Sequence, residues 1–305
     1  MTHKFKGLLV PMLTPFDASG NIDLERAIRF ANDLLGSDVG GLALFGTTSE
    51  GQSLGVQERM DYLDSLIEGG IPPEKLMVGT GSSALTDAIQ MTRHVVHRKC
   101  GGVLMLPPYF YKIVSDEGIF RFFVEVVEKV SSPDLRIYLY HIPPIAQVGF
   151  SIELIGMLVD RFPSQVVGLK NSSGDHNFTI ALRENFPEFD VFCGSENFLL
   201  ETMKIGGVGC ISATGNVNAK EIIKLYNNVD TLRAEKLQML VSEIRTVVQK
   251  HPVIPALKAI ISRTYNDPGW SKVRAPLVEL PSADADALLE QLERHEFFAD
   301  QLFIS

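Results

Sequence analysis

Eight short apolar runs alternate with eight longer amphipathic runs along residues 7–226, and this alternation restricts the fold more than any other feature of the chain. The short runs lack a regular apolar–polar alternation, which is typical of parallel strands that are covered on both faces. The long runs place apolar residues three and four apart, as amphipathic helices do. We predict strands at residues 7–11, 41–45, 76–79, 102–106, 136–140, 166–170, 191–194 and 209–212. We predict helices at residues 23–35, 56–67, 86–97, 115–130, 151–159, 178–184, 196–205 and 219–226.

The repeated order of strand and helix indicates an all-parallel α/β protein, for which two folds compete. A doubly wound sheet that binds a dinucleotide would carry a GxGxxG turn after its first strand, and this sequence has none there. Eight units in about 230 residues fit a (β/α)8 TIM barrel better. We therefore predict a catalytic barrel over residues 1–230. Residues 231–305 form a predicted C-terminal helical appendage, with helices at 232–248, 253–261 and 283–297.

Composition excludes several classes of protein. Lysine and arginine number 28 against 37 aspartate and glutamate residues, and the net charge of −9 comes without a dense basic run, so we expect no nucleic-acid partner. The three cysteines are widely spaced and odd in number, which indicates reduced thiols in a cytoplasmic protein. No apolar stretch reaches the roughly 18 residues of a membrane span, and the N-terminus lacks a signal-peptide cleavage region.

In a barrel of this kind, chemistry lies at the C-terminal ends of the strands. The second predicted strand ends in Gly46-Thr47-Thr48. Small residues there let the backbone approach a ligand, and two hydroxyls beside free N–H groups can hold a carboxylate. The same three residues also suit an ordinary strand-to-helix turn, in which the hydroxyls only satisfy the loop backbone.

The fifth and sixth predicted strands end in residues that can move a proton or form a covalent bond. Tyr140 is either a proton relay or a packed aromatic residue, and His141 points to the opposite face of the strand, where a structural role is expected. Lys170 closes an apolar strand, an unusual place for a lysine. Burial there favours the neutral amine, which is a nucleophile. The alternative is a lysine that reaches the rim or pairs with a carboxylate.

Further polar residues follow the sixth, seventh and eighth predicted strands. Their side chains can bind a hydroxylated substrate, although Ser195 is also well placed to cap the next helix. We expect no metal site, because the seven histidines are scattered and no acidic pair with ligand spacing lies at the strand ends. The candidate substrate-binding residues of these strands are Ser172, Gly194, Ser195, Glu196 and Ser212.

Taken in order along the whole chain, these motifs resemble the dihydrodipicolinate synthase and N-acetylneuraminate lyase family. The resemblance implies that Lys170 forms a Schiff base with a 2-oxo acid such as pyruvate, without an external cofactor. It implies that Tyr140 relays protons and that Thr47 and Thr48 hold the carboxylate, with Lys170, Tyr140 and Thr47 as the catalytic residues. The motifs that carry it are Thr14-Pro15-Phe16, Gly46-Thr47-Thr48, Tyr140 with Ile142-Pro143, Lys170, and Arg274-Ala275-Pro276-Leu277.

The sequence differs from the family at a position that binds the second substrate and at a position that relays protons. Dihydrodipicolinate synthases carry an arginine shortly after the tyrosine of the fifth strand, and Ile145 stands about there in this chain. The family forms homo-oligomers, dimers or tetramers, in which a loop after the fourth strand supplies a tyrosine to the neighbouring subunit. Here that loop reads Tyr109-Phe110-Tyr111, and Phe110 aligns with the tyrosine whose hydroxyl relays protons.

Three functions remain open at this stage. The first is a Schiff-base lyase or aldolase that makes or cleaves a carbon–carbon bond next to pyruvate, acting on a 2-keto-3-deoxy sugar acid or a related 2-oxo acid. The second is dihydrodipicolinate synthase itself, which condenses pyruvate with aspartate semialdehyde. The third is a non-catalytic binder of 2-oxo acids, for which the missing hydroxyl at Phe110 leaves some room.

Overall fold

The structure is a computed structural model that describes residues 5–295 and 297. Eight parallel strands pair in chain order, and β1 pairs with both β2 and β8, which closes the barrel. The strands are β1 (Gly7–Val10), β2 (Gly41–Leu44), β3 (Leu76–Gly79), β4 (Gly102–Met105), β5 (Ile137–His141), β6 (Val166–Asn171), β7 (Asp190–Cys193) and β8 (Gly209–Ile211). The predicted (β/α)8 TIM barrel is confirmed.

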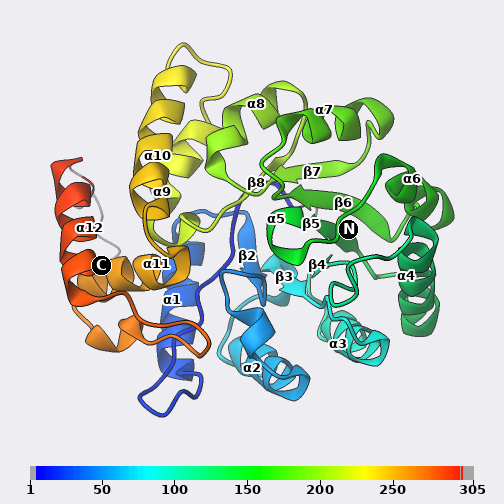
Figure 1. Cartoon of the computed structure of the whole chain (residues 1–305), viewed down its shortest axis with the longest axis horizontal. Coiled ribbons are helices and arrows are strands. Elements are labelled where there is room, and N and C mark those ends of the chain that lie inside the picture. Colours follow the sequence, from blue (N-terminus) through cyan, green and yellow to red (C-terminus); the bar gives the residue numbers. More distant parts are fainter. Residues whose placement is uncertain (1–4, 296, 298–305) are drawn as a thin grey trace.

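Helices surround the strands, and three more lie together at one side of the barrel, beside α1 and α9 (Figure 1). The surrounding helices are α1 (Leu24–Gly36), α2 (Val56–Glu68), α3 (Leu85–His97), α4 (Asp116–Val130), α6 (Ile152–Arg161), α7 (His176–Asn185), α8 (Leu199–Lys204) and α9 (Gly215–Tyr226). The short helix α5 (Pro143–Ala146) lies over the barrel rather than around it (Figure 1). The C-terminal part adds α10 (Ala234–Gln249), α11 (Val253–Tyr265) and α12 (Ser282–Arg294). Short 3-10 turns are η1 (Gly51–Ser53), η2 (Pro73–Lys75), η3 (Glu196–Phe198) and η4 (Pro268–Ser271).

Most predicted elements are present within one or two residues. However, α9 begins four residues before the predicted start at residue 219, and α11 ends four residues after the predicted end at residue 261. The last helix ends three residues before the predicted end at residue 297, and α5 is not among the predicted helices. The helix predicted at 196–205 is divided into η3 and α8, because Ser195 caps a 3-10 turn before the α-helix begins. The helix α3 begins at Leu85, one residue before the predicted start at residue 86. Residues 1–4, 296 and 298–305, and with them the start of the chain and the predicted end of the appendage, lie outside the described residues.

Two apolar layers hold the barrel together. The larger layer lies between the strands and the helices, and residues of α10, α11 and α12 belong to it as much as residues of the barrel do. The smaller layer fills the barrel interior, where the side chains of alternate strand residues stack. Phe5 belongs to the interior layer, with its ring in an edge contact on Tyr138 at 5.9 Å between ring centres. The other interior residues are Leu9, Ala43, Met77, Leu104, Tyr140, Ile142, Ala146, Phe192 and Ile211.

Two further observations concern the whole described chain. Its three cysteines carry free thiols, of which Cys193 and Cys210 are buried and Cys100 is partly buried. Within residues 5–295 and 297, no helix has the length and apolar character that crossing a membrane requires.

Candidate active site

A cavity of about 480 Å³ opens at the C-terminal end of the barrel. Its wall is built from the ends of strands β2, β5, β6, β7 and β8, and the C-terminal helices α10 and α11 close one side. Seven of the ten predicted catalytic and substrate-binding residues lie in this wall, namely Thr47, Thr48, Tyr140, Lys170, Ser172, Gly194 and Ser195. The structure therefore brings together residues that lie up to about 150 positions apart in the sequence.

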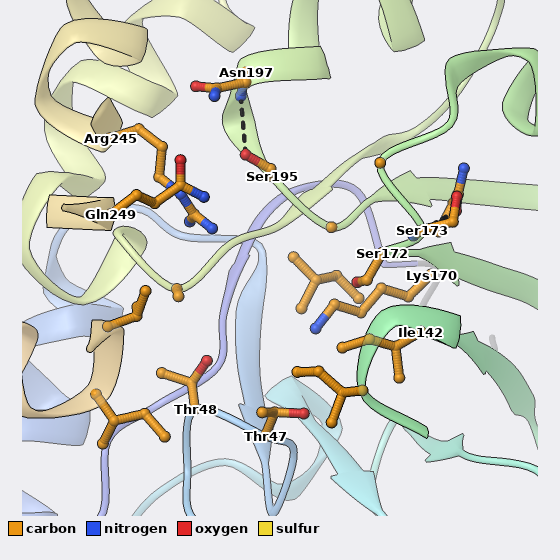
Figure 2. Close-up of a pocket in the computed structure, with 18 of the residues that line it drawn as sticks. Thr47, Thr48, Ile142, Lys170, Ser172, Ser173, Ser195, Asn197, Arg245 and Gln249 are labelled. Carbon is orange, nitrogen blue, oxygen red and sulfur yellow. Dashed lines mark hydrogen bonds between the residues drawn. The ribbon is translucent and has the colours of Figure 1, made fainter. Parts of the chain in front are cut away.

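Lys170 and Tyr140 are register neighbours on strands β6 and β5. Both are buried, at 4% and 3% exposure, and the Lys170 amine lies 4.3 Å from the centre of the Tyr140 ring. Figure 2 shows the amine pointing into the cavity. In the part of the chain that the structure describes, no carboxylate pairs with this amine, so the alternative of a structural ion pair at Lys170 is wrong.

The turn after β2 presents Thr47 to the tyrosine. The Thr47 hydroxyl lies 3.2 Å from the Tyr140 hydroxyl, so a proton can pass between them. Phe45 has the left-handed φ of 57° that bends the chain sharply out of the strand. The turn then closes by a hydrogen bond of 3.1 Å from the Gly51 amide to the Gly46 carbonyl. Gly46 shapes this turn but does not line the cavity.

The ends of β6 and β7 approach each other closely at the cavity wall. A Cβ atom on Gly194 would sit 2.0 Å from the Ser172 hydroxyl oxygen, so only glycine permits this approach. Asn171 holds the following turn, because its side-chain amide donates to the Asp175 carbonyl and to the Thr179 hydroxyl, both at 2.9 Å. Ser195 caps η3 by accepting from the Asn197 amide at 3.3 Å, as its position in the sequence predicts (Figure 2).

Two predicted substrate-binding residues lie behind the wall rather than in it. Glu196 is fully buried and accepts hydrogen bonds from the Ser212 and Thr214 hydroxyls. Arg245, from α10, contacts both Ser212 and Glu196. Its Nη1 atom lies 3.2 Å from the Ser212 hydroxyl and 3.5 Å from the Glu196 carboxylate. Arg245 therefore lines the cavity, whereas Glu196 and Ser212 lie behind it.

The sequence reasoning missed Arg245 and Gln249, which both line the cavity. One signal was present, because Arg245 falls on the apolar stripe of α10 between Val241 and Val248. Burial of an unpaired charge is costly, so a cation on the buried face of an amphipathic helix indicates an ion-pair partner or a ligand. Nothing in the sequence indicates that this helix face meets the cavity.

His141 has the structural role that the sequence predicts. Its side chain points away from the cavity, and its ring stacks on Phe178 at 4.3 Å between ring centres. The Nδ1 atom accepts a hydrogen bond of 3.1 Å from the Phe150 amide. Burial lowers the pKa of His141 to about 4, so the ring is neutral at neutral pH.

The loop of Tyr109, Phe110 and Tyr111 does not line the cavity of the single chain. The Tyr109 hydroxyl donates to the Gln52 side chain, which ties the loop to η1. Phe110 and Tyr111 are exposed and pack edge to face on each other at 5.3 Å between ring centres. Their predicted role at an interface between subunits stays a prediction.

The barrel and its site together define the class of protein. A buried lysine, a tyrosine hydroxyl and a pair of threonines meet at the C-terminal ends of the strands, where TIM-barrel enzymes have their active sites. The family model of the dihydrodipicolinate synthetase family matches residues 4–295. The chain belongs to this family and is a lyase of it.

Individual relatives cover nearly the full length of the chain. An uncharacterized DapA-like lyase of Chloroflexus aurantiacus is 29% identical over 293 residues, which are 95% of this chain and 96% of that protein. A putative 2-dehydro-3-deoxy-D-gluconate aldolase of Escherichia coli is 25% identical and covers 95% of this chain and 97% of its own. The crystal structure of dihydrodipicolinate synthase from Agrobacterium tumefaciens superposes with a TM-score of 0.88 at 32% identity, over 95% of this chain and 99% of that one.

Proposed function

We propose that this chain is a Schiff-base aldolase that makes or cleaves the carbon–carbon bond next to pyruvate. The substrate is a 2-keto-3-deoxy sugar acid or a related 2-oxo acid. The single observation that carries the proposal is Lys170, a buried lysine without a carboxylate partner whose amine points into the cavity. The kinship with the aldolase of Escherichia coli supports the sugar-acid class.

The reaction starts with attack of the Lys170 amine on the keto carbon. A carbon–nitrogen bond forms, the keto oxygen takes up a proton, and loss of water leaves an iminium. The iminium accepts electrons from the adjacent carbon, so a proton leaves the methyl group of pyruvate and an enamine forms. The enamine carbon attacks an aldehyde, a carbon–carbon bond forms, and the aldehyde oxygen takes up a proton. Water then hydrolyses the iminium and restores the amine, and cleavage runs through the same steps in reverse.

Five side chains serve these steps. The Tyr140 hydroxyl lies 3.2 Å from the Thr47 hydroxyl, and the Lys170 amine lies over the ring of the same tyrosine. This hydroxyl moves the protons of iminium formation and of bond making. Thr47 connects this hydroxyl to the turn after β2, and Thr47 and Thr48 hold the carboxylate of the 2-oxo acid. The hydroxyls of Ser172 and Ser195 at the opposite wall bind hydroxyl groups of the sugar chain.

Borohydride trapping tests the proposal. The protein is incubated with pyruvate and sodium borohydride, and intact mass and peptide mapping locate the reduced adduct. We expect one adduct, on Lys170, and none in the Lys170→Ala variant. Lys258 is the internal control, because it is a buried lysine that pairs with Glu50 at 2.6 Å and lies outside the cavity wall. Wild-type protein without an adduct on Lys170 contradicts the proposal.

Dihydrodipicolinate synthase is the second candidate, favoured by the solved structure at 32% identity. Ile145 opposes it, because this exposed apolar side chain lines the cavity about where those synthases carry an arginine. Steady-state assays with pyruvate and either aspartate semialdehyde or a hydroxylated aldehyde separate the two functions, and the hydroxylated aldehydes are glyceraldehyde and its acid counterpart 2-hydroxy-3-oxopropanoate. We expect the higher kcat/KM with a hydroxylated aldehyde, and the reverse order supports the synthase. Pyruvate binding that survives Lys170→Ala unweakened, without turnover of either aldehyde, supports the non-catalytic binder.

We also propose that the chain assembles with copies of itself through the loop between β4 and α4. The loop exposes Phe110 at 71%, Tyr111 at 73% and the fully exposed Ile113, and such an apolar cluster is typical of an interface. Sedimentation velocity is expected to show a dimer or tetramer that Ile113→Asp weakens. Val278→Asp, at an exposed apolar residue elsewhere, is the control and is expected to leave the mass unchanged. A wild-type monomer at micromolar concentration contradicts the assembly. The cytoplasmic location also stays a prediction.

A further inference from the structure

We propose that Arg245 of α10 binds a second carboxylate of the substrate, at the end that lies away from Lys170. The substrate class is then narrower than a 2-oxo acid: it is a 2-oxo acid that also carries a terminal acid group. This inference rests on the proposed Schiff base at Lys170, because it describes the other end of the same bound molecule.

The charges in the cavity wall support a doubly acidic ligand. Among the described residues that line the cavity, the charged side chains are Lys170 and Arg245, and no aspartate or glutamate is with them. The protein as a whole carries a net charge of −9, so a cavity wall with two cations and no acid differs in the sign of its charge from the chain as a whole. Lys170 binds the keto end of the ligand and Arg245 faces the rest of the cavity (Figure 2). A ligand with one acid at each end matches this arrangement.

The volume of the cavity leaves room for such a ligand. A cavity of about 480 Å³ is far larger than the three-carbon pyruvate requires. The excess space extends to the wall that α10 and α11 supply. A longer 2-oxo acid that starts at Lys170 reaches toward this wall, where Arg245 and Gln249 lie.

The Arg245 guanidinium is held in place from two sides. Its Nη1 atom contacts Ser212 at 3.2 Å and Glu196 at 3.5 Å. The Gln249 amide oxygen, in the orientation that satisfies both groups, accepts from Nε at 3.0 Å and from Nη2 at 3.2 Å. These contacts leave further N–H groups of the guanidinium free, and the side chain is only 10% exposed. A fixed, desolvated guanidinium with spare donors is the arrangement that recognises a carboxylate.

The charge of Glu196 favours a carboxylate over a phosphate ester as the group that Arg245 binds. Its buried carboxylate lies next to the guanidinium and offsets part of the arginine charge. A carboxylate ligand brings one negative charge to this pair, whereas a phosphate ester brings nearly two. Like charges at close range are unfavourable in a desolvated site, so the single charge of a carboxylate fits better.

Trapping with matched 2-oxo acids tests the inference without requiring turnover. The first pair is 2-oxoglutarate and 2-oxopentanoate, and the second is 2-oxoadipate and 2-oxohexanoate. Within each pair, a terminal carboxylate replaces a terminal methyl group. The quantity measured is the concentration that gives half-maximal borohydride adduct on Lys170. We expect the acidic member of at least one pair to need a concentration about tenfold or more lower, which corresponds to about 1.4 kcal/mol.

Variants then assign the preference to Arg245. In Arg245→Gln we expect the acidic-to-neutral ratio to fall to about one, while the half-maximal concentration of pyruvate itself changes less than about threefold. The single variant leaves the buried Glu196 carboxylate without its cation, which can prevent folding. The double variant Arg245→Gln with Glu196→Gln removes both charges of the pair, so the test does not depend on the folding of the single variant. Lys250→Gln, which removes an exposed cation from the end of the same helix, is the control and is expected to keep the wild-type ratio.

The possible outcomes separate this inference from the function on which it rests. Pyruvate that is not trapped on Lys170 overturns the proposed function and this inference together. Pyruvate that is trapped while both wild-type ratios are about one overturns the second carboxylate alone. A wild-type ratio that persists in Arg245→Gln and in the double variant overturns the role of Arg245. Tighter trapping of 2-oxo-4-phosphonobutanoate than of 2-oxoglutarate overturns the choice of a carboxylate.

Discussion

Tyr140 and His141 are neighbours in the chain, yet they have opposite roles because a strand alternates its side chains. Tyr140 faces the barrel interior, where its hydroxyl meets Thr47. His141 faces the helices, where Phe178 stacks on its ring and the Phe150 amide donates to it. One position in the strand therefore faces the cavity and the next serves packing.

The buried His141 predicts a pH dependence of stability. Its pKa is about 4 in the folded protein and 6.5 in its ordinary state, so between these values the unfolded chain binds more protons than the folded one. Stability therefore falls as the pH falls from 6.5 to 4, by up to about 3 kcal/mol. Urea unfolding at pH 7 and pH 4.5 measures this loss. We expect the His141→Asn variant, which keeps an acceptor for the Phe150 amide, to lose about 2–3 kcal/mol less than the wild type over this range. Equal losses in both proteins contradict the prediction.

At the scale of elements, one buried ion pair connects the C-terminal helices to the turn that holds Thr47 and Thr48. The Lys258 amine of α11 donates to Glu50 and to the Lys272 carbonyl, both at 2.6 Å. Glu50 has a left-handed φ of 54° and also accepts from the Arg274 amide at 2.9 Å. Both members of the pair are fully buried, so each depends on the other for its opposite charge.

Removal of one member of this pair is expected to cost much of the folding free energy. Lys258→Met leaves the buried Glu50 carboxylate without its cation, and such a loss costs about 3–5 kcal/mol. The double variant Lys258→Met with Glu50→Gln is expected to recover part of it. The control is Lys272→Met, which breaks a half-exposed pair with Glu279 and is expected to cost less than about 1 kcal/mol. Urea unfolding of the four proteins measures these differences, and equal costs for Lys258→Met and Lys272→Met contradict the prediction.

The elements themselves could be predicted well from the sequence, because periodicity is a local property. A strand covered on both faces is an unbroken apolar run, and a helix repeats its apolar residues every three or four positions. The strand prediction at residues 76–79 is therefore confirmed without change. The predicted end of β6 at residue 170 is one residue early, because Asn171 has the sequence character of the first polar residue of a loop, while in the fold it pairs with Cys193 of β7.

At the scale of the whole molecule, the barrel and the C-terminal helices share one apolar layer. This layer contains residues of the barrel helices together with residues of the C-terminal part, namely Val241 and Val248 of α10, Leu257 and Ile260 of α11, and Trp270. The boundary at residue 230 stays a prediction, and this shared layer indicates that it does not separate two independently folding units.

A chain that ends after residue 230 tests this dependence. We expect it to lack a cooperative thermal transition and to bind an apolar dye such as ANS, because the side chains that packed against α10 and α11 become exposed. It also lacks Arg245 and Lys258, so one wall of the cavity and the anchor of Glu50 are missing. A cooperative transition with near-ultraviolet circular dichroism like that of the full chain contradicts the prediction.

The sequence alone determined the barrel and pointed to Lys170, the lysine that we propose as its nucleophile. Alternating strands and helices leave one closed parallel arrangement, and in that arrangement every strand delivers its last residues to the same end. Motifs that lie at strand ends, such as those of Tyr140 and Lys170, therefore converge whatever the details of packing.

Only the tertiary structure decided how the cavity is completed. Arg245 reaches Glu196 across 49 residues, and Lys258 reaches Glu50 across 208 residues. Such contacts depend on where one helix lies against the barrel, and the local pattern of a helix shows that it has a buried face without showing what that face meets. For the same reason, Glu196 and Ser212 could be assigned to the strand ends, but not to the layer behind the wall.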